Sequence, residues 1–484
     1  MHNSSSAFEK NAGIALADKT LQKALSRFQG GFSIRRAQAI ERLPEFDELC
    51  DRARRIKEHT LKFLDHYLEQ FEREVVASGG HVHWAATPED ARRKILDICR
   101  GAGATSVTKG KSMIAEEIAL NPYLEKNGIE PIETDLGEYI IQLRNEPPSH
   151  IIAPAIHVLK EQVAATFRKA HSTFDPSRPL DEARALVDEA REVLRAKFLA
   201  ADVGITGANF LVAETGSAVI VTNEGNGDLT QTLPRVHIVL ASLEKVVPTL
   251  EDATTILRVL ARSATGQEFS TYTTFSTGPK RPGDLDGPEA FHVVLLDNGR
   301  SRILGGDFRE ILSCIRCGAC MNHCPVYGAV GGHAYGGVYP GPLGAALTPA
   351  LDGIASTGAL PNASTLCGRC EEVCPMRIPL PKLLRHHREH EFARRLESTR
   401  SRLCLSIWAF FAKRPKLYRI LAGISSRLLY VVGGKKGHIK RLFLAGSWTG
   451  GRDLPAPQGR TFQSLWSSGD SALSKARRTS QRRQ

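Results

Sequence analysis

Seven cysteines between residues 314 and 374 have the number and spacing of ligands for iron–sulfur clusters. They form two groups, each followed directly by a proline: Cys314-x2-Cys317-x2-Cys320-x3-Cys324-Pro325 and Cys367-x2-Cys370-x3-Cys374-Pro375. The first group is the run typical of bacterial two-cluster ferredoxins, in which the fourth cysteine binds the other cluster. Two clusters in one segment predict one-electron relay as the chemistry of the chain.

The spacing also predicts which cysteines share a cluster. Aligned on its proline, the second group matches the last three cysteines of the first, and the missing first ligand falls at Ser364. The ferredoxin rule gives a first thiol set of Cys314, Cys317, Cys320 and Cys374, and a second thiol set of Cys324, Cys367 and Cys370. The second set predicts either a [3Fe-4S] cluster or a [4Fe-4S] cluster whose remaining iron is held by the Ser364 oxygen, water, substrate or a partner.

Other uses of these cysteines are disfavoured. Cys-x2-Cys knuckles also bind zinc, but a run of four cysteines and a Cys-Pro ending in both groups are not zinc-knuckle features. A c-type haem is excluded because no Cys-x2-Cys-His occurs. Cys50, Cys99 and Cys404 stand alone in the sequence and are interpreted as small hydrophobic residues.

The residues before the cysteine groups predict an α/β layer. Thr87 and Pro88 are a typical N-cap and first helical residue, and they open a helix to about Arg100. Apolar residues at gaps of three and four from Leu61 to Val75 predict one amphipathic helix. Helices at 181–199 and 251–262 alternate with apolar β-branched runs. We therefore expect a mostly parallel sheet, with strands at 104–107, 210–213, 218–222, 236–240 and 291–296.

The rest of the chain has a different composition. Residues 305–380 are rich in Gly, Pro and Cys, so bound metal rather than a large apolar core should organise them. A basic, helical region follows to about Gly446, and then a Ser- and Arg-rich tail that we expect to be loose. Much of the formal charge of +12 lies in this end, which predicts a docking surface or a solvated tail with Lys475, Arg477, Arg478, Arg482 and Arg483.

Composition also bounds location and partners. The first 25 residues lack the basic start and continuous apolar core of a secretory signal. We therefore expect a cytoplasmic protein, and clustered cysteines in such a reducing compartment favour metal binding over disulfides. No apolar stretch approaches about 20 residues, which predicts no transmembrane helix and leaves peripheral membrane contact open. No nucleic-acid-reading motif is visible, so a regulator that senses iron or redox state and binds nucleic acid through its basic end is the least favoured class.

Three further patterns could indicate function, but each also has a structural interpretation. Lys109-Gly110-Lys111-Ser112 invites a phosphate-loop interpretation, but Thr105 stands where that motif needs glycine, so a strand-to-helix turn capped by Ser112 is preferred. His386, His387 and His390 are interpreted as a solvated helix face. A polar, glycine-rich set predicts turns or, alternatively, a pocket at strand ends: Gly204, Gly207, Glu214, Gly216, Ser217, Asn223, Glu224, Gly225, Asn226 and Gly227.

Several separate blocks resemble the lactate utilisation protein B family. They are residues 108–118 (TKGKSMIAEEI), 204–210 (GITGANF), 213–227 (AETGSAVIVTNEGNG) and both cysteine groups. The resemblance runs from about Phe46 to Leu384, with weaker similarity in the basic C-terminal part. Lys109 is a small departure, because a small polar residue is expected there.

The resemblance implies an α/β domain similar to the three-layer sheet of sugar-phosphate isomerases and CoA-transferases, followed by an α-helical two-cluster ferredoxin-like domain. It implies two [4Fe-4S] clusters bound by the same seven cysteines, so the gap at Ser364 belongs to the family pattern. On this basis we divide the chain into an N-terminal helical segment (1–70), a lactate-utilisation domain (71–298), a dicluster domain (299–390) and a basic C-terminal region (391–484).

The function implied is that of an iron–sulfur electron-transfer subunit, which acts with two companion proteins to oxidise L-lactate to pyruvate. The resemblance supplies no catalytic residue. The alternative is a directly catalytic subunit that binds the hydroxy acid at the open iron or in a pocket near Glu214 and Asn223. The electron acceptor is not predicted.

Overall fold

The computed structural model describes residues 4–28, 31–442, 446–449 and 452–468. The chain divides into two compact units, Met1–Arg394 and Arg395–Gln484, which we describe separately. The basic residues predicted to form a loose tail, from Lys475 to Arg483, lie outside the described residues.

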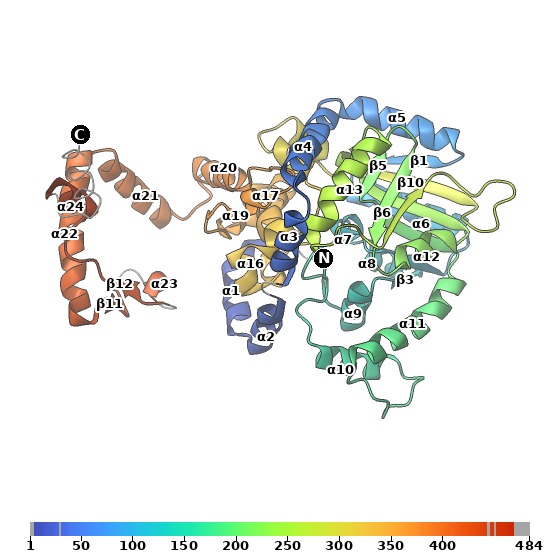
Figure 1. Cartoon of the computed structure of the whole chain (residues 1–484), viewed down its shortest axis with the longest axis horizontal. Helices are drawn as coiled ribbons and strands as arrows, with labels where there is room; N and C mark the ends of the chain where they lie inside the picture. The colour runs from blue at the N-terminus through green and yellow to red at the C-terminus, as the bar shows by residue number, and fades with distance from the viewer. Residues whose placement is uncertain (1–3, 29–30, 443–445, 450–451, 469–484) are drawn as a thin grey trace. The chain divides into compact units, whose positions relative to one another are not determined.

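A parallel six-stranded sheet is the centre of the first unit (Figure 1). Its strand order is β1-β10-β7-β4-β2-β3, and every neighbouring pair is parallel. The strands are β1 (His81–Ala85), β2 (Ser106–Lys109), β3 (Glu130–Glu133), β4 (Val203–Gly207), β7 (Val236–Ser242) and β10 (Ala290–Leu296). Runs such as Ile238-Val239-Leu240 are buried on both faces, as parallel strands covered on both sides require.

Each face of this sheet has its own apolar cover. One face packs through Val107, Ile205 and Ile238 against helices such as α6 (Pro88–Gly101), α7 (Met113–Glu117) and α8 (Leu120–Lys126). The other face packs through Val239, Phe291 and Val293 against α5 (Leu64–Ala77) and a second, smaller sheet. These layers confirm the predicted three-layer α/β architecture.

The second sheet has the order β8-β5-β6-β9 and is mixed, with β6 antiparallel to both β5 and β9. Its strands are β5 (Phe210–Val212), β6 (Ser217–Thr222), β8 (Val246–Val247) and β9 (Tyr272–Ser276). Three helices contact this sheet: α4 (Phe46–Lys62), α12 (Asn226–Thr232) and α13 (Leu250–Ala264). Outside β3, α9 (Leu136–Arg144), α10 (Lys160–Ala170) and α11 (Ala183–Ala200) form a separate helical core.

Most local predictions are confirmed, with two corrections. The Thr87 side chain accepts a hydrogen bond from the backbone N–H of Asp90 at 3.2 Å, so it caps α6 as expected. The single helix predicted from Leu61 to Val75 is wrong, because the backbone of Phe63 leaves the helical region and separates α4 from α5. The strand expected at 104–107 is β2 at 106–109, since Ala104 still belongs to the turn that ends α6.

The cysteine segment is built from short helices around the two thiol groups. They are α14 (Arg300–Leu304), α15 (Ala319–Asn322), α16 (Pro325–Val330), α17 (Gly341–Asp352), α18 (Ile354–Thr357), α19 (Arg369–Glu372) and α20 (Leu380–Ala393). Its buried apolar residues, such as Leu343 and Leu380, share one core with α4 and α13.

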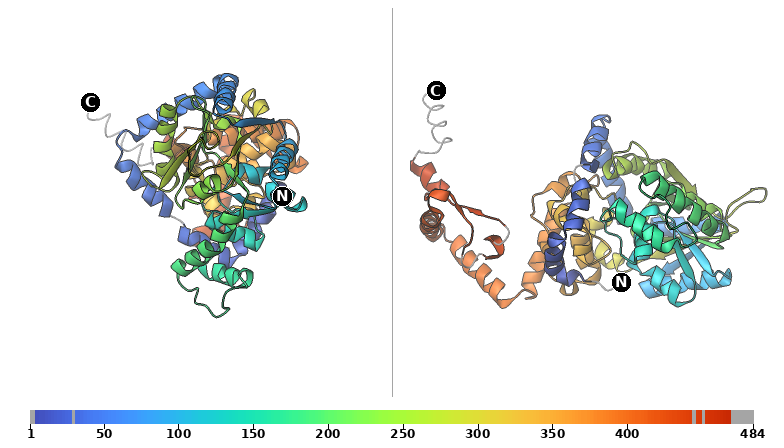
Figure 2. Two further views of the ribbon diagram at one scale, coloured as in Figure 1. Left: turned by 90° about the vertical axis from the view of Figure 1, so that its right-hand side faces the viewer. Right: turned by 90° about the horizontal axis from the view of Figure 1, so that it is seen from below.

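The N-terminal helices α1 (Phe8–Ala17), α2 (Lys19–Phe28) and α3 (Gly31–Glu41) also pack on the cysteine segment (Figure 2). The side-chain N–H of Gln22 donates to the carbonyl of Ala329 at 2.9 Å, and Arg36 donates to the carbonyl of Val373 at 3.1 Å. The start of the chain is therefore part of the shell around the cysteines.

The second unit is mainly helical, with α21 (Thr399–Ala412), α22 (Pro415–Gly433), α23 (Gly446–Thr449) and α24 (Phe462–Ser468). A two-residue antiparallel pair, β11 (His438–Ile439) and β12 (Leu454–Pro455), lies between them in the sequence. Large apolar side chains such as Trp408 and Val431 are exposed on α21 and α22. Among the described helices, none is long and apolar enough to cross a membrane.

Candidate metal centre

The first cysteine group is held by two turns in the left-handed backbone region. Arg316 has φ +60°, and Gly318 has φ +73° and begins the short helix α15. Cys324 is the N-cap of α16, with Pro325 at the first helical position. These turns direct Cys314, Cys317 and Cys320 toward one point, while α15 separates Cys324 from them.

The second group repeats this backbone pattern. Leu366, before Cys367, has φ +53°, and Gly368, after it, has φ +84° and begins the four-residue helix α19. Helix α15 has the same length and starts at the equivalent position. The repeat seen in the cysteine spacing is thus a repeat in structure.

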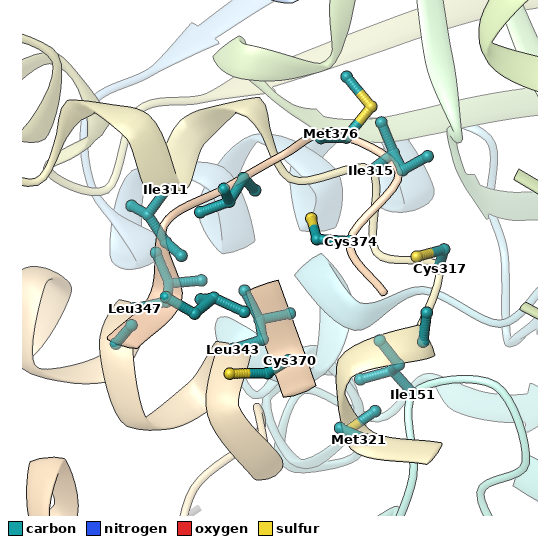
Figure 3. Packing of buried hydrophobic residues seen from close by; sticks show 14 of the residues in the cluster. Ile151, Ile311, Ile315, Cys317, Met321, Leu343, Leu347, Cys370, Cys374 and Met376 are labelled. Carbon is teal, nitrogen blue, oxygen red and sulfur yellow. The ribbon is translucent and has the colours of Figure 1, made fainter. Parts of the chain in front are cut away.

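Four thiols from both groups line one cavity. These are Cys314, Cys317, Cys320 and Cys374, the predicted first thiol set. Figure 3 shows Cys317 and Cys374 on separate segments that pass close to each other. Apolar side chains complete the lining: Ile315, Leu343, Met376, Ile378 and Leu380.

The remaining three thiols also lie close enough to influence one another. Burial, and then the thiols of Cys324 and Cys367, raise the pKa of Cys370 to about 12. The pKa of Cys324 is likewise raised by burial and by Cys367. These three thiols therefore lie near one another, and Cys370 also acts on Cys320 of the first set.

The two sets differ in exposure. Cys317 and Cys374 are buried in the first set, whereas Cys367 in the second set is exposed to solvent. A hydrogen bond from the backbone N–H of Arg369 lowers the pKa of the Cys367 thiol. The second set is thus the one that a partner can approach.

The donor chemistry fits iron–sulfur clusters. None of the ten cysteines, all of which lie in the described part of the chain, forms a disulfide. Burial and the surrounding thiols raise the pKa of Cys320 well above its ordinary value, so several buried thiolates need a bound cation to be stable together. Three buried cations lie near enough to Cys314 for it to raise their pKa values, as expected beside an anionic centre: Lys57, Lys245 and Arg316.

Ser364 occupies the place of the missing cysteine. Its hydroxyl oxygen accepts a hydrogen bond from the backbone N–H of Leu366, two residues later, at 3.1 Å. In the first group, the sulfur of Cys314 accepts the same bond from Arg316 at 3.4 Å. The predicted alignment of Ser364 with Cys314 is therefore matched by local geometry.

A buried charge network ties the first thiol set to the α/β sheet. Arg316, which lies between Cys314 and Cys317 in the sequence, donates from its guanidinium to Glu244 at 3.2 Å. Glu244 is also ion-paired with Arg300, with 2.8 Å between Oε2 and Nε. Although burial opposes its charge, Arg300 and Arg316 lower the pKa of Glu244 to about 2. The roles of Glu244, Arg300 and Arg316 were not predicted from the sequence, because Glu244 is far from both arginines in the chain.

A second cavity, of about 280 Å³, opens at the carboxyl ends of β2, β4 and β7. Its lining includes Lys111, Asn226 and Lys245 from the α/β part, and Arg316 from the cysteine segment. The predicted pocket residue Asn223 lines it, but Glu214 does not: its carboxylate accepts a hydrogen bond from the backbone N–H of Leu250. The glycine-rich set therefore forms both turns and part of a pocket.

The phosphate-loop interpretation would need Lys111 to bind phosphate, but this side chain donates a hydrogen bond to the carbonyl of Ile152, which disfavours it. The neighbouring lysine has a structural role. The Lys109 side chain is fully buried and lies 2.7 Å from Glu133 and 3.4 Å from Glu116. Ser112 instead accepts a hydrogen bond from Ala115 N–H at 3.2 Å and caps α7, as predicted. Lys109 is a structural ion-pair residue.

The histidines of α20 are only in part a solvated face. His387 is buried, stacks on Phe308 and hydrogen-bonds the carbonyl of Ala346 at 2.8 Å, which corrects the prediction for this residue. His386 and His390 lie nearer the surface, beside Asp307. Of the lone cysteines, Cys50 and Cys99 are buried as predicted, whereas Cys404 is exposed.

Comparison with known protein families gives two matches along the chain. The LUD domain family matches residues 68–296, and the 4Fe-4S dicluster domain family matches residues 310–378, which hold all seven clustered cysteines.

Curated relatives match almost the full length. Lactate utilization protein B of Lysinibacillus sphaericus is 42% identical over 471 residues, covering 96% of this chain and 97% of the relative. Lactate utilization protein B of Bacillus subtilis is 41% identical and covers 94% and 95%. The uncharacterized electron transport protein YkgF of Escherichia coli is 41% identical and covers 95% and 96%.

A solved structure of a DUF162 family protein from Deinococcus radiodurans covers 48% of this chain and 98% of that protein, at 14% identity and a TM-score of 0.27.

Proposed function

Because the chain belongs to the lactate utilization protein B family, we propose that it is the iron–sulfur electron-transfer subunit of a complex that oxidises L-lactate to pyruvate. Two companion lactate-utilisation proteins would complete the complex. Clustered cysteines spaced as metal ligands, with no disulfide among the described residues, support a cytoplasmic location. The observation that carries the proposal is the meeting of thiols from two distant groups at one cavity.

The assignment of ligands follows the two thiol sets. Cys314, Cys317, Cys320 and Cys374 would hold one [4Fe-4S] cluster, and Cys324, Cys367 and Cys370 would hold a second, with Ser364 beside its open iron. Such clusters supply one-electron transfer at low cost in rearrangement. The turns at Gly318 and Gly368 orient the neighbouring cysteines. The apolar lining around the first thiol set keeps water away from its sulfur atoms.

The difference in exposure supports a direction of transfer. The first thiol set adjoins the cavity at the end of the sheet through Arg316, whereas the second set reaches the surface at Cys367. We infer that electrons enter at the buried set and leave through the exposed one, where an acceptor protein can dock.

Anaerobic reconstitution of the purified chain tests the proposal. The protein should gain broad visible absorption that bleaches on reduction, and metal analysis should find iron and sulfide. Zinc alone would contradict it. Lactate-dependent dye reduction should need the two companion proteins, and turnover by the isolated chain would instead favour a directly catalytic subunit.

A further inference from the structure

The cavity at the carboxyl ends of β2, β4 and β7 has the features of a ligand site. Ligands of open parallel sheets bind outside the carboxyl ends of the strands, and the volume of about 280 Å³ suits a small molecule. Its walls include the apolar side chains of Ile114, Ile152, Leu240 and Leu260. The ligand therefore has an organic body as well as polar groups.

Two buried polar side chains in the lining have no partner within the described residues. Lys245 is 8% exposed, and its ammonium group has neither a hydrogen-bond acceptor nor an ion-pair partner there. Asn226 is also 8% exposed, and its side-chain amide is without a hydrogen bond in the same part of the chain. Buried polar groups without partners are costly, so both groups favour a ligand that satisfies them.

Two other lysines near the cavity are already occupied. Lys111 donates to the carbonyl of Ile152, and Lys57 donates to the carbonyls of Glu244 and Val246. Arg316 donates to Glu244 through Nη2, whereas its Nε and Nη1 have no hydrogen-bond partner within the described residues. Lys245 and Arg316 are thus the cations that are available to an incoming anion.

We propose that this cavity binds a small organic carboxylate, whose negative charge is held by Lys245 and whose polar atoms are hydrogen-bonded by Asn226. A carboxylate fits one unpaired ammonium group better than a doubly charged phosphate does, because Asp135 and Glu224 also line the cavity and repel a second negative charge.

The site lies directly beside the first thiol set. Arg316 belongs to the cavity wall and follows Cys314 by two residues in the sequence, while Ile152 lines the cavity and would lie 3.2 Å from a Cβ added at Gly318. A bound carboxylate would therefore change the electrostatic surroundings of that set. The binding itself does not depend on the proposed function, but the effect on a cluster does.

Binding is measured by calorimetry on the anaerobically reconstituted full chain, with L-lactate, pyruvate and inorganic phosphate as separate probes. We expect one site for a carboxylate and weaker binding of phosphate. Lys245→Met should raise the Kd about tenfold or more. The matched control is Lys280→Met, because Lys280 is exposed and paired with Glu289, and its Kd should stay unchanged.

A second readout separates the two ideas. The electron paramagnetic resonance signal of the reduced protein should shift when the carboxylate binds, and Lys245→Met should abolish this shift at the same ligand concentration. If reconstitution yields no iron–sulfur cluster but the chain still binds the carboxylate, the electron-relay proposal is contradicted and the site stands. No carboxylate binding by a fully reconstituted chain would overturn the site alone.

Two further outcomes also decide against the site. Equal or tighter binding of phosphate would show that the ligand class is wrong. If Lys245→Met lowers the iron content and leaves carboxylate binding unchanged, Lys245 balances cluster charge and does not bind a ligand. Asn226→Leu, with normal iron content and weaker carboxylate binding, would support the site independently.

Discussion

Arg300 and Glu117 form a two-pronged ion pair, with both Nη1–Oε1 and Nη2–Oε2 at 2.8 Å, although 183 residues separate them. Glu117 also accepts hydrogen bonds from Asn298 at 2.7 Å and from the Tyr339 hydroxyl at 2.6 Å. Since Tyr339 belongs to the cysteine segment and Glu117 to helix α7, this carboxylate joins the thiol-bearing part to the α/β part.

Glu117→Ala should therefore lower the free energy of unfolding by about 3–5 kcal/mol, because it leaves the Arg300 charge buried without this partner. Denaturant unfolding measures the change. Glu89→Ala is the control, since Glu89 pairs with Arg92 at the surface and should cost at most about 1 kcal/mol. Equal effects of the two variants would contradict the role of Glu117.

Cys374→Ser and Cys324→Ser should each remove a different cluster. Each variant should keep about half of the iron, and the resonance signals that they retain should differ, because Cys374 lies with the first group and Cys324 with the second. Cys404→Ser is the control, as Cys404 is exposed and outside both sets. Loss of the same signal in both variants would disprove the crossed assignment.

Ser364→Cys should act on the second thiol set alone. Its oxygen already has the position that sulfur has in Cys314, so a cysteine there supplies a fourth thiolate. Any three-iron signal should become a four-iron signal, while the signal of the first set stays as it was. A change in the first set instead would show that the sets are assigned wrongly.

Glu189 should make part of the stability depend on pH. Hydrogen bonds from Arg178, at 2.6 and 2.7 Å, lower the pKa of this carboxyl group against the opposing effect of burial. A lowered folded-state pKa gives stability that is complete above the unfolded value of about 4.3 and is lost as the pH falls through the folded value.

Glu189→Gln should cost about 2 kcal/mol at pH 7. The difference in thermal midpoint between wild type and variant should shrink as the pH falls below about 4.3. Glu192→Gln, on the same helix, serves as a control for the loss of a carboxylate. A midpoint difference that is constant over this range would argue against the Arg178–Glu189 pair as its source.

The two thiol sets could be proposed from the sequence, because the spacing of cysteines and the glycines that favour positive φ are local signals. The N-cap at Thr87 and the parallel sheet were predictable for the same reason. The network of Glu117, Glu244 and Arg300 was not, since each ion pair depends on the packing of distant segments. Burial also decides what Lys109 does, and a four-residue motif contains no information about burial.

The residues that surround the first thiol set come from segments that the ribosome synthesises at very different times. During synthesis the N-terminal helices emerge early, three of the thiols follow at 314–320, and Cys374 comes more than fifty residues later. A nascent chain that has not yet released Cys374 has an incomplete cavity. Metal loading must therefore wait until most of the protein has left the ribosome, and a chain that ends prematurely before that point cannot be matured.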